Sequence, residues 1–217
     1  MFMAVLATLT DQHIVSFGMI LAGVVVGSGI GAALAVRIQM TEMPQLVALF
    51  NGFGGIASVL VAGTASVETA IQDGVPLVQM SAAVMASGLI GAVTFCGSLI
   101  AFAKLQGLIS ENATKFAGQQ PVNAALAVVA LLCAAWGIMV PEASTPYWAL
   151  VIVSAVLGIL LTIPIGGADM PVVIALLNSY SGIAAAATGF VLANNALIIA
   201  GSLVGASGLI LTQIMCK

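Results

Sequence analysis

Long uncharged stretches separated by isolated charged residues dominate the pattern of this chain. A bilayer core of about 30 Å requires about 20 apolar helical residues, because each advances about 1.5 Å along the axis. A final uncharged stretch, residues 170–216, is long enough for two spans, and Ala193-Asn194-Asn195 near its middle predicts a turn. Five other stretches have the length of one span each: residues 14–36, 43–67, 77–103, 122–140 and 147–163. The pattern predicts an all-α, polytopic transmembrane helix bundle with seven full spans.

Composition supports this class and excludes others. Of the 217 residues, 62% are hydrophobic and 5% are charged, whereas a soluble domain carries about a quarter charged residues. Residues 1–10 are apolar but too short to cross, and no basic residue precedes them, so we expect a short N-terminal apolar stub. The net charge of −3 argues against a nucleic-acid partner, and three separate cysteines form no metal set. We expect one transmembrane domain over residues 1–217.

The basic residues predict the orientation in the membrane, because short cytoplasmic loops carry Lys and Arg. Seven spans that begin outside place all four basic residues inside, and the opposite orientation places all four outside. We therefore expect an N-terminus outside and a cytoplasmic C-terminus. The four residues are Arg37, Lys104, Lys115 and Lys217.

The second and sixth spans resemble each other in sequence. Residues 42–57 and 169–184 share an acid-Met-Pro start, an Asn nine positions after the acid, and a later Gly-Ile-Ala. Each copy is followed by a helix with a similar element, Leu89–Ala92 or Leu203–Ala206. The sequence thus predicts a parallel internal repeat of spans two and three in spans six and seven.

Acidic residues open both copies of the repeat. Glu42, with Thr41, and Asp169 precede a Pro in the first helical turn, where the free N–H groups attract a capping acceptor. A capping role and a proton-handling role are compatible, and the sequence leaves both open.

Glycines at four-residue spacing predict close helix packing. Small residues at this spacing form a groove into which another helix backbone fits. A nucleotide-binding glycine loop would need a preceding strand, which this pattern lacks. The predicted packing residues are Gly23, Gly27, Gly31, Gly201 and Gly205.

Polar residues inside the spans are the candidate functional residues. Asn51 and Asn178 each lie about 13 Å into a helix, close to mid-membrane. Helical spacing places Ser58 on the face of Asn51, and Ser181 and Thr188 on the face of Asn178. These two faces predict a hydrated proton path, the alternative being that each Asn only bonds a neighbouring helix.

The single histidine, His13, lies close to Asp11 at the outer mouth of the first span. An imidazole with an ordinary pKa of about 6.5 suits proton exchange. His13 is either a candidate residue of the proton path or a residue at the membrane interface that takes no part in it.

Several segments, in this order, resemble the membrane domain (domain II) of the β subunit of proton-translocating nicotinamide nucleotide (NAD(P)) transhydrogenase. The resemblance extends over nearly the whole chain after Val15. The segments are MTEMPQLVA at 40–48, GAVTF at 91–95 with Gly97-Ser98, KLQG at 104–107, GGADMPVV at 166–173, NSYSG at 178–182 and IMCK at 214–217.

The resemblance implies an enzyme complex that passes hydride between NAD(H) and NADP(H) in two soluble domains and couples this transfer to proton movement. It implies that this chain contains no hydride-transfer residue and binds no cofactor itself. Asp169, with Glu42 at the matching position, would contact the NADP(H) domain, and Asn178 would line the proton path. The implied partners are the lipid bilayer, an NAD(H)-binding α subunit, an NADP(H)-binding domain, further transmembrane helices and a second protomer. The implied location is a bacterial inner membrane.

Three departures from the family pattern stand out. Asn51 occupies a position in the second span where many relatives have a histidine, so the relay would need water or His13. The family's β subunit begins with a further helix or two and continues into an NADP(H) domain, which we would expect after Lys217. The sequence therefore suggests a membrane-domain fragment or a split subunit.

The charge-poor helices and the parallel repeat also allow two other functions: a secondary transporter of a small solute, and a structural membrane subunit. Transporters usually break their site-forming helices near mid-membrane. The uncharged stretches here have no Pro at their centres, which favours the proton-pump domain.

The predicted orientation can be tested with single cysteines at Lys115 and Asp73, in a chain whose own cysteines are replaced. A membrane-impermeant thiol reagent added outside should label the cysteine at residue 73 and leave that at residue 115 unlabelled. The reverse labelling pattern would invert the topology.

Overall fold

A computed structural model describes residues 17–68, 77–141 and 143–217. Within these ranges the chain is helical and contains no strand, and seven helices are long and apolar enough to cross a membrane. This confirms the predicted all-α class with seven spans. The helices are α2 (Phe17–Arg37), α3 (Met43–Glu68), α4 (Leu77–Leu105), α5 (Gln119–Met139), α6 (Thr145–Thr162), α7 (Met170–Val191) and α8 (Asn195–Met215), with 3-10 turns η1 (Met40–Glu42) and η2 (Gly167–Asp169).

The long C-terminal apolar stretch divides where the Ala-Asn-Asn sequence predicted a turn. Ala193 has a positive φ of 51°, which reverses the chain after α7. The Asn194 side chain then accepts a hydrogen bond of 3.1 Å from the Leu197 N–H and so caps α8. The predicted N-terminal stub and His13 lie outside the described residues.

The chain forms two compact units, Met1–Met43 and Pro44–Lys217. In the first unit, none of the α2 residues is buried. A Cβ added at Gly23, Gly27 or Gly31 would meet no atom within 4 Å among the described residues of this unit. The packing role of these three glycines therefore stays a prediction.

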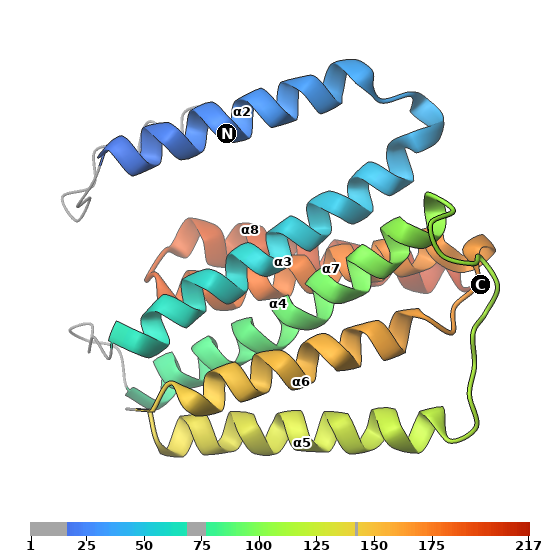
Figure 1. Cartoon of the computed structure of the whole chain (residues 1–217). Helices are drawn as coiled ribbons and strands as arrows, with labels where there is room; N and C mark the ends of the chain where they lie inside the picture. The colour runs from blue at the N-terminus through green and yellow to red at the C-terminus, as the bar shows by residue number, and fades with distance from the viewer. Residues whose placement is uncertain (1–16, 69–76, 142) are drawn as a thin grey trace. The chain divides into compact units, whose positions relative to one another are not determined.

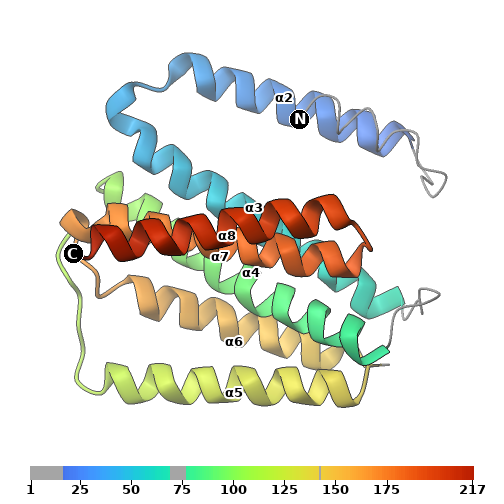
Figure 2. The ribbon, with the colours of Figure 1, turned by 180° about the vertical axis from the view of Figure 1, so that it is seen from behind.

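In the second unit, consecutive helices run in opposite directions, and α4 lies at the centre (Figure 1). Helix α4 contacts α5, α6 and α7, and α8 packs along α7, as the reverse view also shows (Figure 2). The helices make these contacts where their backbones pass close to each other. A Cβ on Gly158 of α6 would lie 2.5 Å from the carbonyl oxygen of Val93 in α4.

The α7–α8 crossing is consistent with the packing prediction for two glycines of the C-terminal helix. A Cβ on Gly201 would lie 2.5 Å from the Ala186 nitrogen and 2.6 Å from the Gly182 oxygen. A Cβ on Gly205 would lie 2.8 Å from the Ile183 side chain, and one on Gly182 of α7 would lie 2.6 Å from the Gly205 nitrogen. Because real Cβ atoms do not approach backbone so closely, α7 and α8 touch through their main chains at these positions.

The two predicted copies of the repeat share two local features. In each, a 3-10 turn precedes the helix that carries the Pro. A Cβ on Gly55 would lie 2.6 Å from the Gly91 oxygen, and one on the corresponding Gly182 would lie 2.6 Å from the nitrogen of Gly205, the counterpart of Gly91. These features are consistent with the repeat, which itself remains a prediction.

Replacing Gly201 with Leu should separate α7 from α8, because its new side chain would meet backbone atoms that cannot move aside. Overpacking of this kind costs about 1–3 kcal/mol or more, so the thermal midpoint of the purified protein should fall. Ala206→Leu, one turn later on the exposed face of α8, is the matched control and should change the midpoint little. Equal shifts for the two variants would contradict the crossing.

Candidate functional site

The two asparagines predicted near mid-membrane, Asn51 and Asn178, lie on facing helices of the second unit. Asn51 of α3 is buried, and its side-chain nitrogen donates a hydrogen bond of 3.4 Å to the carbonyl oxygen of Ile174 in α7. Asn178 lies one turn further along α7 and is half-buried. Its side chain makes no hydrogen bond to the residues that the structure describes. The Asn51 amide is thus tied to α7 by one of its two N–H donors, whereas the whole Asn178 amide remains available to another partner.

The next polar side chain along this interface, Ser181, lies against a glycine. A Cβ on Gly54 of α3 would lie 2.7 Å from the hydroxyl oxygen of Ser181 in α7. The absence of a side chain at Gly54 therefore provides the space for this hydroxyl. Since Gly54 follows Asn51 by about one turn and Ser181 follows Asn178 likewise, the interface presents two successive polar levels.

A third level joins three helices. The Ser87 hydroxyl of α4 lies 2.8 Å from the Thr188 hydroxyl of α7 and 3.2 Å from the carbonyl oxygen of Ser58 in α3. Thr188 also lies 2.9 Å from the Ala184 oxygen of its own helix. Ser87 therefore connects Ser58 and Thr188, two of the predicted path residues, and Ser58 contributes its backbone oxygen rather than its hydroxyl.

This third level has fewer hydroxyl hydrogen atoms than oxygen–oxygen contacts. Ser87 and Thr188 have one hydroxyl hydrogen each, while three oxygen–oxygen contacts connect Ser58, Ser87, Thr188 and Ala184. Three arrangements place both hydrogens in hydrogen bonds, and in two of them the hydroxyls bond each other: both point toward α3, or both point toward Ala184. The chain of hydroxyls can reverse its direction without moving a heavy atom.

The sequence pattern did not identify two residues of this region, Ser87 and Tyr147. Ser87 belongs to a helix rich in Ala, Gly and Ser, where no spacing distinguishes it. Tyr147 of α6 is fully buried and donates a hydrogen bond of 2.5 Å to the Val59 oxygen of α3. It reaches α3 across α4 because a Cβ on Gly88 would lie 2.6 Å from its ring. In the sequence, the only feature that distinguishes Tyr147 is its position as an aromatic residue at the start of a predicted span.

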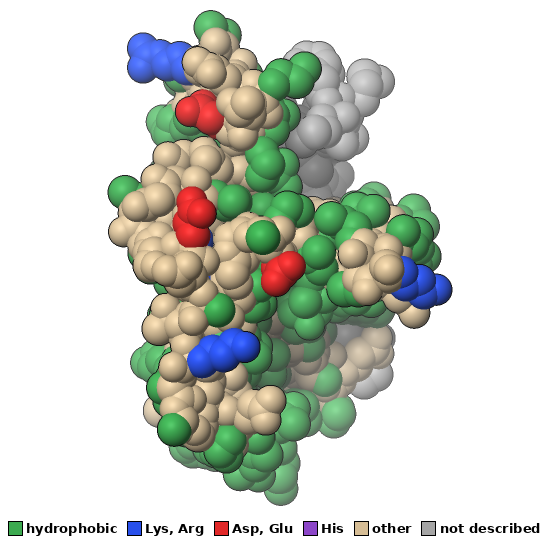
Figure 3. All heavy atoms as spheres, turned by 90° about the vertical axis from the view of Figure 1, so that its right-hand side faces the viewer, with side chains coloured by type: hydrophobic (Ala, Val, Ile, Leu, Met, Phe, Trp, Pro, Cys, Tyr) green, Lys and Arg blue, Asp and Glu red, His purple; other side chains and the backbone are tan. Residues whose placement is uncertain are grey.

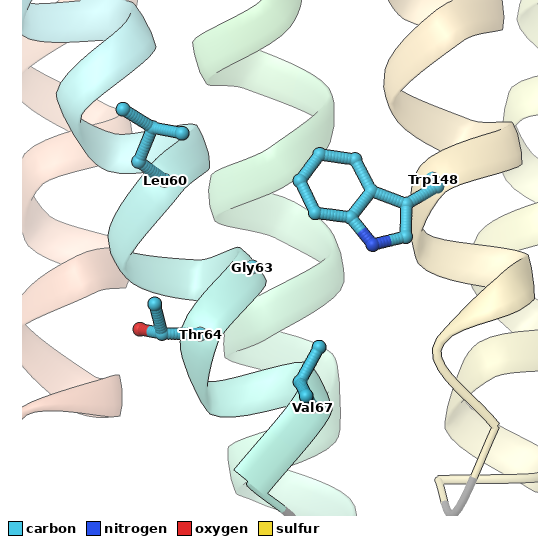
Figure 4. Close-up of a pocket in the computed structure, with 5 residues that line it drawn as sticks. All are labelled: Leu60, Gly63, Thr64, Val67 and Trp148. Carbon is cyan, nitrogen blue, oxygen red and sulfur yellow. The ribbon is translucent and has the colours of Figure 1, made fainter.

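An apolar groove lies beside this region, between α3 and α6 (Figure 4). Its volume is about 310 Å³. No titratable side chain lines it, so it is distinct from the polar levels. Its lining residues are Leu60, Gly63, Thr64, Val67 and Trp148.

Charged side chains of the second unit gather at the end where α4, α6 and α8 finish, which we call the charged end. Figure 3 faces this end of the chain, where acidic and basic side chains lie among apolar ones. The side chains of Glu68, Asp73 and Glu142, predicted for the opposite side of the membrane, lie outside the described residues. The charged end contains Lys104, Glu111, Lys115, Asp169 and Lys217.

The predicted helix-capping role of Asp169 is wrong. Asp169 is exposed and directly precedes α7, but its side chain accepts no hydrogen bond from the first turn. Its φ of −92° and ψ of 0° continue the 3-10 turn η2, whereas a capping residue usually has an extended backbone that turns its side chain over the free N–H groups. The carboxylate of Asp169 is therefore free of the helix it precedes.

Glu42 in the first unit caps a different element from the one expected. Its carboxylate accepts a hydrogen bond of 3.3 Å from the Gln39 N–H. This bond closes the 3-10 turn η1 and leaves the first turn of α3 uncapped by Glu42. The predicted capping of α3 is thus corrected to capping of the turn before it.

Comparison with known proteins identifies similar chains. A family model described as NAD(P) transhydrogenase beta subunit matches residues 1–217. Two curated relatives, each named NAD(P) transhydrogenase subunit beta and both from Rhodospirillum rubrum, are 46% identical to this chain over 226 residues. The alignment covers 100% of this chain and 47% of each relative. The chain spans about half the length of these relatives.

The hydroxyl pair Ser87 and Thr188 can be tested by a double-mutant cycle of Ser87→Ala and Thr188→Val. The free energy of unfolding should show a coupling of roughly 0.6–1.7 kcal/mol, the range measured for side-chain hydrogen bonds between membrane helices. The control cycle pairs Ser87→Ala with Thr212→Val, whose hydroxyl binds its own helix at Gly208. Additive effects in both cycles would show that the 2.8 Å contact contributes nothing.

Proposed function

The chain belongs to the NAD(P) transhydrogenase beta subunit family, and from this premise we propose that its helices form the proton-translocating membrane domain of a transhydrogenase. The complex would transfer hydride between NAD(H) and NADP(H) in separate soluble domains. Proton movement through this chain would be coupled to that transfer. The described residues would supply the membrane path and its connection to the partner domains.

The polar interface between α3, α4 and α7 is the observation that carries this proposal. Polar side chains inside a membrane usually face a functional path or another helix. Here Asn51, Ser181 and the Ser87–Thr188 pair form successive levels along one helix interface. Such a line of donors and acceptors provides binding positions for water within an otherwise apolar bundle.

The unbonded Asn178 amide and the reversible hydroxyl pair suggest how protons would move. Asn178 offers a carbonyl oxygen and two N–H donors to water at mid-membrane. By rotating their hydroxyl groups, Ser87 and Thr188 can change from donating toward α3 to donating toward Ala184. Neither step requires Asn51 to titrate. His13, the remaining candidate relay, lies outside the described residues.

The exposed Asp169 supports a docking role at the charged end. Asp169 directly precedes Met170, the first buried residue of α7, and its carboxylate accepts no hydrogen bond from the first turn of that helix. In the proposed complex Asp169 would contact the NADP(H)-binding domain, with Glu42 as its counterpart before α3. Contact there would act directly on the helix that carries Asn178.

The proposed assembly follows from the same premise. The chain would lie in a bacterial inner membrane with its charged end toward the cytoplasm. Its partners would be an NAD(H)-binding α subunit, an NADP(H)-binding domain, further transmembrane helices and a second protomer. A secondary transporter receives no support, because α3 and α7 run unbroken through mid-membrane.

Asn178→Leu in the complete complex should abolish proton pumping. The substitution replaces an amide with an apolar group of similar size, and a buried water needs two to four polar partners. Flux in sealed vesicles should fall by at least about tenfold, and coupled hydride transfer should slow with it. The protein should remain folded, as judged by its thermal midpoint.

Asn195→Leu is the matched control, because Asn195 is exposed at the start of α8. It should leave both rates within about twofold of the parent. Normal coupled flux in a folded Asn178→Leu complex would remove Asn178 from the path.

A further inference from the structure

Lys104 is a fully buried lysine that the proposed proton path does not use. It is the penultimate residue of α4, and its side chain is 0% exposed. Its ammonium donates hydrogen bonds to three carbonyl oxygens: 2.6 Å to Ile163, 2.8 Å to Ile165 and 3.2 Å to Asn112. Because an ammonium has three hydrogens, these bonds use all of its donors. Among the described residues, no carboxylate pairs with it.

The three carbonyls belong to two segments that are far apart in the sequence. Ile163 and Ile165 lie in the connection from α6 to η2, which we call the 163–169 segment. Asn112 lies in the loop between α4 and α5, residues 106–118. The end of α6 has unpaired carbonyls and a negative helix dipole, both of which favour a cation. Lys104 therefore joins the loop and the segment to the end of α4.

A backbone hydrogen bond strengthens the same junction. The Gly167 N–H donates to the Glu111 oxygen at 2.9 Å. The 163–169 segment ends at Asp169 and continues directly into α7. A displacement of the 106–118 loop would thus be passed through this junction to the start of the helix that carries Asn178.

We propose that Lys104 is a positioning residue that holds the 106–118 loop and the 163–169 segment together as one body, so that a partner domain docking on the charged end displaces α7. This inference rests on the proposed function. Lys104 binds no substrate and carries no proton in this role. It supplies the rigid connection between the docking surface and the polar interface.

The test uses Lys104→Met in the complete transhydrogenase complex, reconstituted in sealed vesicles. Methionine keeps an unbranched apolar chain but removes all three donors. Coupled proton flux should fall by roughly tenfold, and fewer protons should move per hydride transferred. Dinucleotide binding by the soluble domains should not change. A purely structural role would lower the amount of assembled complex without changing the proton-to-hydride ratio.

Arg37→Met is the matched control. It also removes one positive charge, but Arg37 is exposed at the end of α2 in the first unit and is not part of the charged end, so flux and ratio should stay within about twofold of the parent. An equal loss of coupling in both variants would assign the effect to charge and overturn the role of Lys104.

A reversible cross-link tests the connection itself. A Cβ on Gly167 would lie 3.2 Å from the Glu111 Cβ, slightly inside the usual separation of about 3.5–4.5 Å in disulfides. Glu111→Cys with Gly167→Cys should therefore form a disulfide after a small backbone shift. The chain's own cysteines, Cys96, Cys133 and Cys216, are replaced by Ala. Oxidation should restore the proton-to-hydride ratio of the Lys104→Met complex, and a reductant should abolish it again.

The outcomes separate the two proposals. A parent complex that moves no protons overturns the proposed function together with this inference. Normal pumping in the parent and an unchanged ratio in Lys104→Met overturn the inference alone. If Lys104→Met does not assemble, it is assembled with the disulfide formed and then reduced. The inference is supported if reduction of the disulfide abolishes coupling in Lys104→Met but not in the same double-cysteine complex that keeps Lys104. Unchanged coupling after reduction of Lys104→Met overturns the inference.

Discussion

Main-chain contact between helices is the constraint on which the rest of the second unit depends. Where Gly55 meets Gly91, and where Gly182 meets Gly201, no side chain separates the two helices. At this distance a hydroxyl on one helix reaches a carbonyl oxygen on the next, as the 2.6 Å bond from Ser179 to Gly205 illustrates. In lipid there is no hydrophobic drive between helices, so close packing and these short hydrogen bonds have to hold them together.

The same closeness determines which polar groups are saturated. Ser179 and Tyr147 each donate to a carbonyl of a neighbouring helix, so they act in packing and have no hydrogen left for water. The Ser87–Thr188 pair differs, because it has two hydrogens for three acceptor contacts. Polarity alone therefore does not identify a proton path. The useful criterion is whether a donor or an acceptor remains open after the helix contacts have been counted.

Sequence reasoning located the spans because each is bounded by charges or by a turn, and these signals are local. It also found Gly201 and Gly205, since a four-residue glycine spacing defines one helix face. It missed Ser87, whose significance comes from residues 29 and 101 positions away. It treated Lys104 as a marker of orientation and as part of a family segment, but not as a buried residue, because a lysine at the end of an apolar stretch looks the same whether it is exposed or enclosed by carbonyls. The capping of α7 by Asp169 failed because the 3-10 turn before the helix sets the backbone of that residue.

The two asparagines that the repeat places at matching positions differ in the folded chain. Asn51 is buried and gives a side-chain hydrogen to the Ile174 carbonyl, whereas Asn178 is half-buried and makes no hydrogen bond within the described residues. If the helices arose by duplication, the amide of Asn51 came to connect two helices, whereas the amide of Asn178 kept its donors and acceptor free for water. An amide bonded in this way resists rotation, while an open one can reorient as water exchanges beside it. On this argument the interface has a fixed side on α3 and an adjustable side on α7, and α7 is also the helix that begins beside the Lys104 junction and the free carboxylate of Asp169.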